Sequence, residues 1–217
     1  MKKEQFISNL LKLNEQDAKK TLEHLEAFND GVIAIIITIM VLEIPAPHGG
    51  LISYFEFLKS IGIFLTSFFV VANFWYELNK MYSGVIYATK GMVVVDLMYL
   101  ASLAILPVLT KWIMEDPSKL AVINYGIIYM IIELLGLWIS HFSFNIMIHK
   151  SENSTQIHAK SNKAIRMRTI ILIVVNLAII AFSFKFAKFM IYAYLALPII
   201  DFFFPEEWHW RIKRKQR

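Results

Sequence analysis

The stretch HLEAFNDGVIAIIITIMVLEI, residues 24–44, decides the fold of this chain. In it an acid-bearing turn, Phe28-Asn29-Asp30-Gly31, leads into a run of apolar and hydroxyl residues without charge, Val32 to Leu42. Lipid-facing helices avoid such an acid, so the turn either stays in water or is held by another part of the protein. The stretch predicts a membrane helix with a polar group at one end.

The composition of the whole chain favours a protein that crosses the membrane several times. Of its 217 residues, 57% are hydrophobic and 18% are charged, and the mean hydropathy is +0.54. The net charge of +5 comes from basic residues beside apolar runs, which indicates membrane topology rather than binding to nucleic acid. Cysteine is absent, which excludes disulfides, thiolate metal sites and cysteine nucleophiles.

Six apolar stretches qualify as membrane spans, because a bilayer core about 30 Å thick needs about 17 to 25 mostly apolar helical residues. The last two form one long apolar region interrupted by Lys185 and Lys188, so they could be a single overlong helix or a tight hairpin of two short helices. The expected spans are Phe28 to Ile44, Phe57 to Leu78, Met92 to Ile113, Leu120 to Phe144, Thr169 to Phe184 and Phe186 to Phe204.

The distribution of basic residues favours six spans over five. With six spans, 17 of the 22 lysines and arginines lie on the side of both termini, which is the positive-inside pattern of a cytoplasmic side. Five spans would place the tail RIKRKQR outside. The expected fold is therefore an all-α integral membrane protein of six transmembrane helices, in the plasma membrane with both termini cytoplasmic. No cleaved signal peptide is expected, since Phe6 to Leu13 is interrupted by polar residues.

This topology divides the chain into three parts. Residues 1–27 are expected to form a cytoplasmic amphipathic helix that leads into span one, with Asn14 as its N-cap. Residues 28–204 form the six-helix transmembrane domain, and residues 149–168 within it form a cytoplasmic connection. Residues 205–217 form a basic cytoplasmic tail that begins with an interfacial aromatic belt, Trp208 to Trp210.

The first span carries two different chemical features on different sides. At about 100° per residue, Asp30 lies about 140° from Ile35 around the helix. An apolar face with one threonine could serve only for helix packing, and an acid at a span end could be only a structural anchor. The residues that share the face of Ile35 are Gly31, Ile35, Thr38, Ile39 and Leu42.

This span resembles the first helix of the lysosomal and endosomal potassium-channel family and its bacterial homologues. The hallmark of that family is an arginine, three residues, and then Phe-Ser-Asp. A weaker likeness lies in span three, where Asp96-Leu97, Leu106-Pro107 and Thr110 resemble an Asn-Leu run that leads to Leu-Pro-Phe-Pro-Thr. The matching residues of span one are Leu25, Glu26, Ala27, Phe28, Asp30, Gly31, Val32, Ala34, Ile35, Thr38, Val41, Leu42, Glu43 and Ile44.

The resemblance implies a passive, potassium-permeable cation channel. Bacterial members of the family are single six-span repeats that form homotetramers in the bilayer, with a central pore lined by the first helix and no TVGYG filter. Carried over by position, Ile35 forms the hydrophobic constriction, Thr38 a hydroxyl ring one turn outward, and Leu42 a further apolar layer, with Ile39 and Gly31 on the same face. The permeant ion is potassium, and no cofactor or nucleic acid is expected.

The same resemblance assigns the motif residues His24, Phe28, Asn29 and Asp30 to a network that ties span one to its neighbours. Asp30 is expected to accept a hydrogen bond from span two or three, with Trp75, Asn73 and Asn79 as candidate donors. Two residues depart from the motif. Asn29 replaces the serine and can keep a hydrogen bond, whereas His24 replaces the arginine and loses its permanent charge. His24 is therefore either a bland replacement or a source of pH sensitivity.

Other polar residues suggest rival functions. Glu133, near the middle of span four, is either a helix contact with Asn176 or His141, or a proton site. A proton-coupled transporter that uses Glu133 and Asp30 is the alternative function, and a membrane-bound enzyme or assembly factor is a further one. Asp96 and Asp201 lie nearer to span ends, which suggests structural or interfacial roles. The histidines lack metal-ligand spacing and the acids form no hydrolytic pair, so no enzyme is expected.

Overall fold

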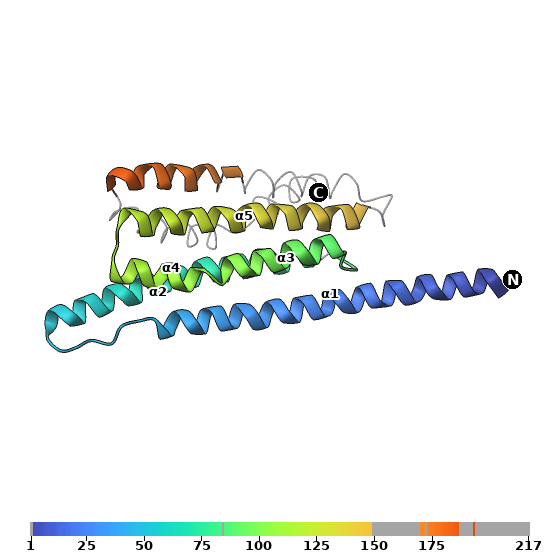
Figure 1. Ribbon diagram of the computed structural model, residues 1–217, viewed down its shortest axis with the longest axis horizontal. Coiled ribbons are helices and arrows are strands. Elements are labelled where there is room, and N and C mark those ends of the chain that lie inside the picture. Colours follow the sequence, from blue (N-terminus) through green and yellow to red (C-terminus); the bar gives the residue numbers. More distant parts are fainter. Residues whose placement is uncertain (1, 84, 149–169, 172, 187–192, 194–217) are drawn as a thin grey trace, which may run out of the picture.

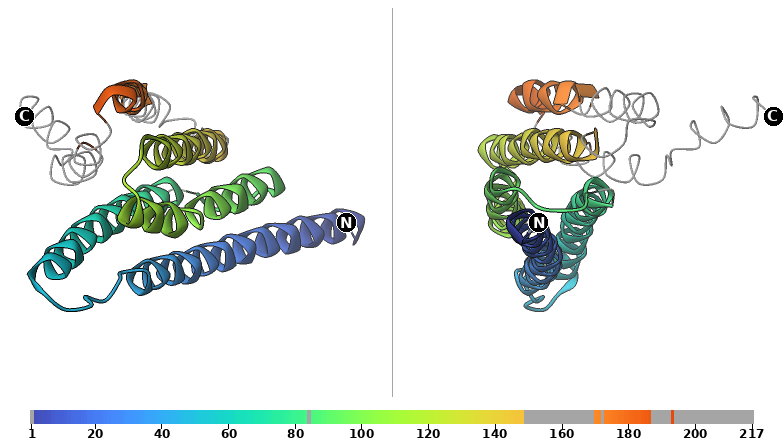
Figure 2. Two further views of the ribbon diagram at one scale, coloured as in Figure 1. Left: turned by 60° about the vertical axis from the view of Figure 1, so that its left-hand side comes forward. Right: turned by 90° about the vertical axis from the view of Figure 1, so that its right-hand side faces the viewer.

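The computed structural model describes residues 2–83, 85–148, 170–171, 173–186 and 193. α1, α2, the α3–α4 pair and α5 run alternately in opposite directions (Figure 1). α1 lies beside α2 and the α3–α4 pair, and α5 lies on their other side (Figure 2). An apolar helix, Ile173–Phe186, follows α5. The labelled helices are α1 (Lys2–Leu42), α2 (Leu51–Tyr82), α3 (Lys90–Leu103), α4 (Leu106–Glu115) and α5 (Lys119–Ile148).

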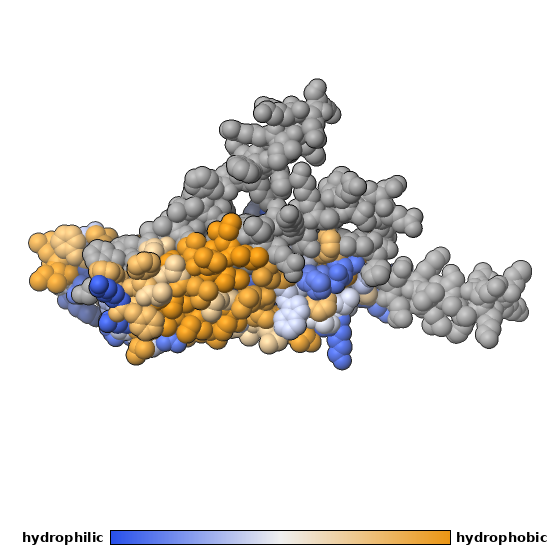
Figure 3. Space-filling view, turned by 90° about the horizontal axis from the view of Figure 1, so that it is seen from above, coloured by the Kyte–Doolittle hydropathy of each residue, from blue (hydrophilic) through white to orange (hydrophobic). Residues whose placement is uncertain are grey.

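Within the described residues, four segments are helical, long and apolar enough to cross a membrane. They bear out the first four expected spans in kind, although their boundaries differ. Hydrophobic side chains form a broad central area on the face seen in Figure 3, and hydrophilic side chains lie to the left and right of it along the long axis. The segments are Gln16–Leu42, Leu51–Tyr82, Lys90–Glu115 and Lys119–Ile146.

Helix α1 is continuous from the N-terminal segment into the membrane. The expected N-terminal helix and the first expected span form one unbroken helix from Lys2 to Leu42. The expected N-cap at Asn14 is wrong, because α1 begins at Lys2 and Asn14 lies inside it. Leucine and lysine, which occur just before Asn14, have high helix propensity and extend the helix past this residue. The N-terminal end of α1 projects beyond the bundle (Figure 1).

The third expected span, Met92 to Ile113, is broken into two helices. Helix α3 ends at Leu103 and α4 begins at Leu106, with Pro107 in its first turn. Proline has no backbone N–H, so the carbonyl of Leu103 loses its usual helical partner four residues later. The chain turns at Ala104 and Ile105 and continues in the same direction (Figure 1).

The other helices extend past their expected ends. Helix α2 begins at Leu51 rather than Phe57 and ends at Tyr82, and α5 runs to Ile148 rather than Phe144. The helix that corresponds to the fifth span continues through Lys185 to Phe186. Nearly all of the expected sixth span, together with the 149–168 connection, Asp201, the tryptophan belt and the basic tail, lies outside the described residues, so the count of six stays a prediction.

The core is formed where α1, α2, α3, α4 and α5 meet. Three tyrosines, Tyr99, Tyr125 and Tyr129, are among the largest fully buried side chains. Tyr99 donates from its hydroxyl to the carbonyl of Phe74 at 3.0 Å, which links α3 to α2. Burial of aromatic rings with a satisfied hydroxyl gives both contact area and a fixed orientation. This core supports the inner side of α1.

Candidate functional site

Helix α1 has one buried side and one exposed side within the membrane. Its buried residues recur every three or four positions, as expected for one face of a helix. The predicted pore residues lie on the exposed side, where the side chain of Ile35 is 58% exposed, that of Ile39 42% and that of Leu42 80%; Gly31 and Thr38 are exposed as well. The buried residues are Leu22, Leu25, Asn29, Ile33, Ile36 and Met40.

The hydroxyl of Thr38 is oriented by its own helix. Its Oγ1 donates to the carbonyl oxygen of Ile35 at 2.8 Å. A threonine hydroxyl has one hydrogen and two lone pairs, so this bond uses the hydrogen and leaves the lone pairs as acceptors. On an exposed helix face, such an oxygen can accept a hydrogen bond from water or contact a cation.

Asp30 is held by the second helix. Nε1 of Trp75 on α2 donates to Oδ1 of Asp30 at 2.8 Å. Trp75 was one of the three candidate donors in the sequence, so this expectation is confirmed. The acid next to the apolar run therefore has a protein partner, although the contact lies at an exposed part of the chain.

The neighbouring residue, Asn29, is part of a buried contact among three helices. Its Nδ2 donates to Oδ1 of Asp96 on α3 at 3.0 Å, and the hydroxyl of Tyr82 on α2 donates to the same oxygen at 2.5 Å. Asn29 is 3% exposed and Asp96 is fully buried. Of the two roles expected for Asp96, structural or interfacial, the structural one is supported, because α3 packs this residue against α1 inside the bundle.

The two remaining motif residues lie on the outer surface of α1. Phe28 is 52% exposed, and the hydrogen bonds from this motif to neighbouring helices come from Asn29 and Asp30. His24 is exposed as well, and among the described residues no hydrogen bond or ion pair of its side chain is found. The assignment of His24 to the motif network therefore stays a prediction.

Two further sets of contacts link the helices, one at the other end of α1 and one among α2, α4 and α5. Lys111 on α4 forms an ion pair with Glu43, just after α1, with 2.7 Å between Nζ and Oε2. Deeper in the bundle, Oγ1 of Thr110 lies 2.8 Å from Oγ of Ser67, and Tyr125 donates to the same Ser67 oxygen at 3.2 Å. Sequence analysis missed both sets. Their only signal was the threonine in the span-three motif.

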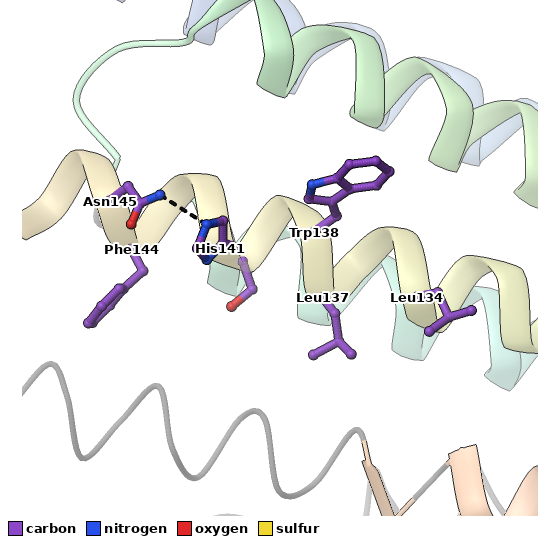
Figure 4. Close-up of a pocket in the computed structure, with 7 residues that line it drawn as sticks. Leu134, Leu137, Trp138, His141, Phe144 and Asn145 are labelled. Atoms are coloured by element: carbon purple, nitrogen blue, oxygen red, sulfur yellow. Dashed lines mark hydrogen bonds between the residues drawn. The ribbon is translucent and has the colours of Figure 1, made fainter.

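The polar residues of α5 lie apart from the contacts of α1. Glu133 is half-buried, and α1 and α5 are not among the closely packed helix pairs of the described chain. Nδ2 of Asn176 donates to the carbonyl of Gly126 at 3.0 Å. Nε2 of His141 and Nδ2 of Asn145 lie 3.2 Å apart, and both residues line a groove on α5 (Figure 4). No cluster of three metal-binding side chains occurs among the described residues.

These features define a class: a multi-pass helical membrane protein whose first helix is anchored on one side and bare on the other. Comparison with known proteins is more specific. Residues 24–107, which run from His24 to the start of α4, match the family model of the endosomal/lysosomal potassium channel TMEM175. The part of α1 from His24 onward, together with α2 and α3, thus lies in the segment that is similar to this family.

Two curated relatives are bacterial potassium channels. One, from Chryseobacterium sp. strain P1-3, is 32% identical over 129 residues, which are 58% of this chain and 63% of that protein. The other, from Streptomyces collinus, is 28% identical over 125 residues, which are 52% of this chain and 61% of that protein. The matches therefore span less than two thirds of the length of either relative.

A solved structure shares the fold. It is a crystal structure of a lysosomal potassium-selective channel TMEM175 homologue from Chamaesiphon minutus, with a TM-score of 0.66 and 22% sequence identity. The likeness covers 83% of this chain and 96% of that one. The arrangement of helices in this chain is thus similar to the fold of that solved structure.

Proposed function

We propose that this chain forms a potassium-permeable cation channel that conducts passively. Four copies assemble in the plasma membrane, with both termini in the cytoplasm, around a pore lined by α1. Ile35 forms the hydrophobic constriction, Thr38 a ring of hydroxyls, and Leu42 a further apolar layer, with Gly31 and Ile39 on the same face. Support comes from the similarity of residues 24–107 to the TMEM175 family and from the bacterial relatives named as potassium channels.

The observation that carries the proposal is the division of α1 into two sides. Asn29 and Asp30 are bonded to neighbouring helices, whereas Ile35 and Leu42 are exposed in the single chain. An exposed apolar face within a membrane helix can contact lipid or another subunit. The hydroxyl of Thr38 within this face favours contact with a pore, since its acceptor lone pairs would have no partner in lipid.

The residue types determine how such a pore would work. Isoleucine side chains cannot replace the hydration shell of an ion, so a narrow ring of them stops conduction by dewetting, and a wider ring lets hydrated ions pass. Threonine oxygens can then substitute for some of the water around the ion. Selectivity is expected to be moderate and to favour potassium, which loses water more readily than sodium.

Potassium flux into liposomes that contain the purified protein tests the proposal. The variants are Ile35→Asn, which places an amide in the constriction, and Thr38→Ala, which removes the hydroxyl ring. The expected results are a higher flux for Ile35→Asn and a lower potassium-to-sodium ratio for Thr38→Ala. The control is Val108→Asn, because Val108 lies on α4 and is 66% exposed, similar to Ile35 but outside the proposed pore.

Two outcomes would contradict this function. If flux is present but Ile35→Asn and Thr38→Ala change neither its rate nor its ion ratio, α1 does not line the pore. If flux appears only with a proton gradient, the protein is a proton-coupled transporter instead. A channel needs only the potassium gradient itself.

A further inference from the structure

The buried contact between α1 and α3 lacks a hydrogen-bond donor. Asn29 and Tyr82 both donate to Oδ1 of Asp96. The other two oxygens, Oδ1 of Asn29 and Oδ2 of Asp96, are buried and have no hydrogen-bond partner among the described residues. A buried acceptor without a donor carries the full cost of its desolvation. Two unsatisfied acceptors in one contact indicate that a hydrogen-bond donor, such as a proton, lies between them.

The charge of Asp96 leads to the same conclusion. The titratable groups around it and its neighbour Tyr99 are Tyr82 and Glu77 on α2 and Glu133 on α5, while α1 contributes the neutral Asn29. None of these groups is a cation. A fully buried carboxylate without a positive partner is strongly disfavoured, and it normally takes up a proton instead.

We propose that Asp96 holds a proton on Oδ2 and donates it to Oδ1 of Asn29, so that the two side chains form a cyclic carboxylic acid–amide pair. In this pair the amide N–H of Asn29 donates to one carboxyl oxygen, and the acid O–H donates back to the amide oxygen. One proton thereby satisfies both orphan acceptors and removes the buried charge. The interface of α1 and α3 is then a proton-binding site.

Other ligands account for these observations less well. One water molecule could donate to both oxygens, but it would leave the negative charge of Asp96 in place. A metal cation would neutralise the charge, but hard cations in proteins are surrounded by several oxygens, and only two acceptors are unsatisfied here. The proton alone matches both the number of missing bonds and the missing charge.

The site links the docking of α1 to pH, and it does so whether or not the chain conducts ions. An aspartate in water loses its proton at about pH 4, whereas the proposed acid–amide pair holds the proton of Asp96 up to neutral pH. Between these limits the folded state binds more protons than the unfolded state, so stability falls as pH rises. Deprotonation would restore a buried charge and weaken the contact of Asn29 with α3.

Infrared difference spectroscopy of the full-length protein in detergent tests the proposal. At neutral pH, the spectrum of the wild type minus that of Asp96→Asn should show the C=O stretch of a protonated carboxyl. Asparagine at position 96 can donate its own N–H to Asn29, so this variant should fold. The matched control is Asp116→Asn, because Asp116 is an exposed acid after α4 and should contribute no such band.

Melting temperature gives a second readout. The melting temperature of the wild type should fall relative to that of Asp96→Asn as pH rises from about 5 to about 8, with the sign given above. In Tyr82→Phe, which removes the donor to Oδ1, the carboxyl band should move. If Asp96→Asn does not fold, the shift of the carboxyl band in Tyr82→Phe assigns the band to Asp96. A carboxyl band at the same frequency in Tyr82→Phe and the wild type overturns the proposal.

Two results would overturn the proposal directly. The first is a wild-type spectrum with no protonated carboxyl, or a band that persists in Asp96→Asn. The second is a selective rise in the melting temperature of the wild type, but not of Asp96→Asn, when potassium or sodium chloride is added. That result would assign the site to a metal cation instead of a proton.

Discussion

Asp30 and Asn29 are consecutive residues of α1 that bind different helices. Asp30 accepts a hydrogen bond from Trp75 on α2, and Asn29 donates to Asp96 on α3. Side chains of consecutive helical residues point about 100° apart, so the two bonds resist rotation of α1 about its own axis in both directions. The rotation of α1 determines that Ile35, rather than Ile36, faces away from the bundle.

Replacement of Trp75 by phenylalanine tests the first of these bonds. The ring volume is largely kept but the indole N–H is lost, so Asp30 loses its donor. We expect the free energy of unfolding to drop by about 1 kcal/mol, as for a partly exposed hydrogen bond, measured as a lower melting temperature in detergent. Trp138→Phe is the control, because Trp138 is 55% exposed on α5. Equal losses in the two variants would argue against the bond.

Cysteine cross-linking tests the assembly around α1. The chain has no cysteine, so a single introduced thiol reports only on its own position. We expect Leu42→Cys to give disulfide-linked dimers on mild oxidation in liposomes, because Leu42 is 80% exposed and would meet its copies across the pore. Val108→Cys should stay monomeric on a denaturing gel. Dimers from Val108→Cys alone would place the subunit contact on α4 instead.

The buried hydroxyls of Thr110 and Ser67 should stabilise the bundle. Thr110 is fully buried, and its hydroxyl lies 2.8 Å from both Ser67 and the carbonyl of Leu106. Thr110→Val keeps the shape and removes the hydroxyl, which should cost about 1 kcal/mol in thermal unfolding. Tyr125 also donates to Ser67, so Thr110→Val and Tyr125→Phe should be non-additive in a double-mutant cycle. Strict additivity would mean that Ser67 does not connect them.

His24 should make flux depend on pH. It is exposed on α1 and takes the place of an arginine, which is permanently charged. We expect potassium flux through the wild type to change between about pH 5.5 and about pH 8, whereas His24→Arg, which is permanently charged, should lose that part of the dependence. The same pH profile in both proteins would show that His24 is a bland replacement.

Apolar composition was sufficient to predict the first four membrane spans, and local chemistry was sufficient to predict one anchor. A run of uncharged residues has few alternatives to a membrane helix, and Trp75 was a suitable donor for Asp30. The exact helix ends were less predictable. The break before Pro107 did have a signal in the sequence, since proline disfavours the helix interior, but the run of apolar residues on both sides outweighed it.

The partner of Asn29 was beyond the reach of the sequence. Asp96 is 67 residues away, and whether it faces α1 or the headgroups depends on how deeply α3 sits and how it is rotated. Both are properties of packing that one helix alone does not encode. The same reason applies to Ser67 and Tyr125, because nothing in their local sequence indicates that the packing of three helices brings them into contact.

Helix α1 is a single rod whose two halves lie in different surroundings. With 41 residues it is about 60 Å long at the usual helical rise, about twice the thickness of the bilayer core. The loop before α3 contacts α1 near the middle of the helix, where the backbone N–H of Ala88 donates to the carbonyl of Ala18 at 3.1 Å. A rotation of the projecting N-terminal half about the helix axis would therefore be transmitted along the continuous helix to residues 31–42. The loop before α3 would hold the helix in position between the two halves.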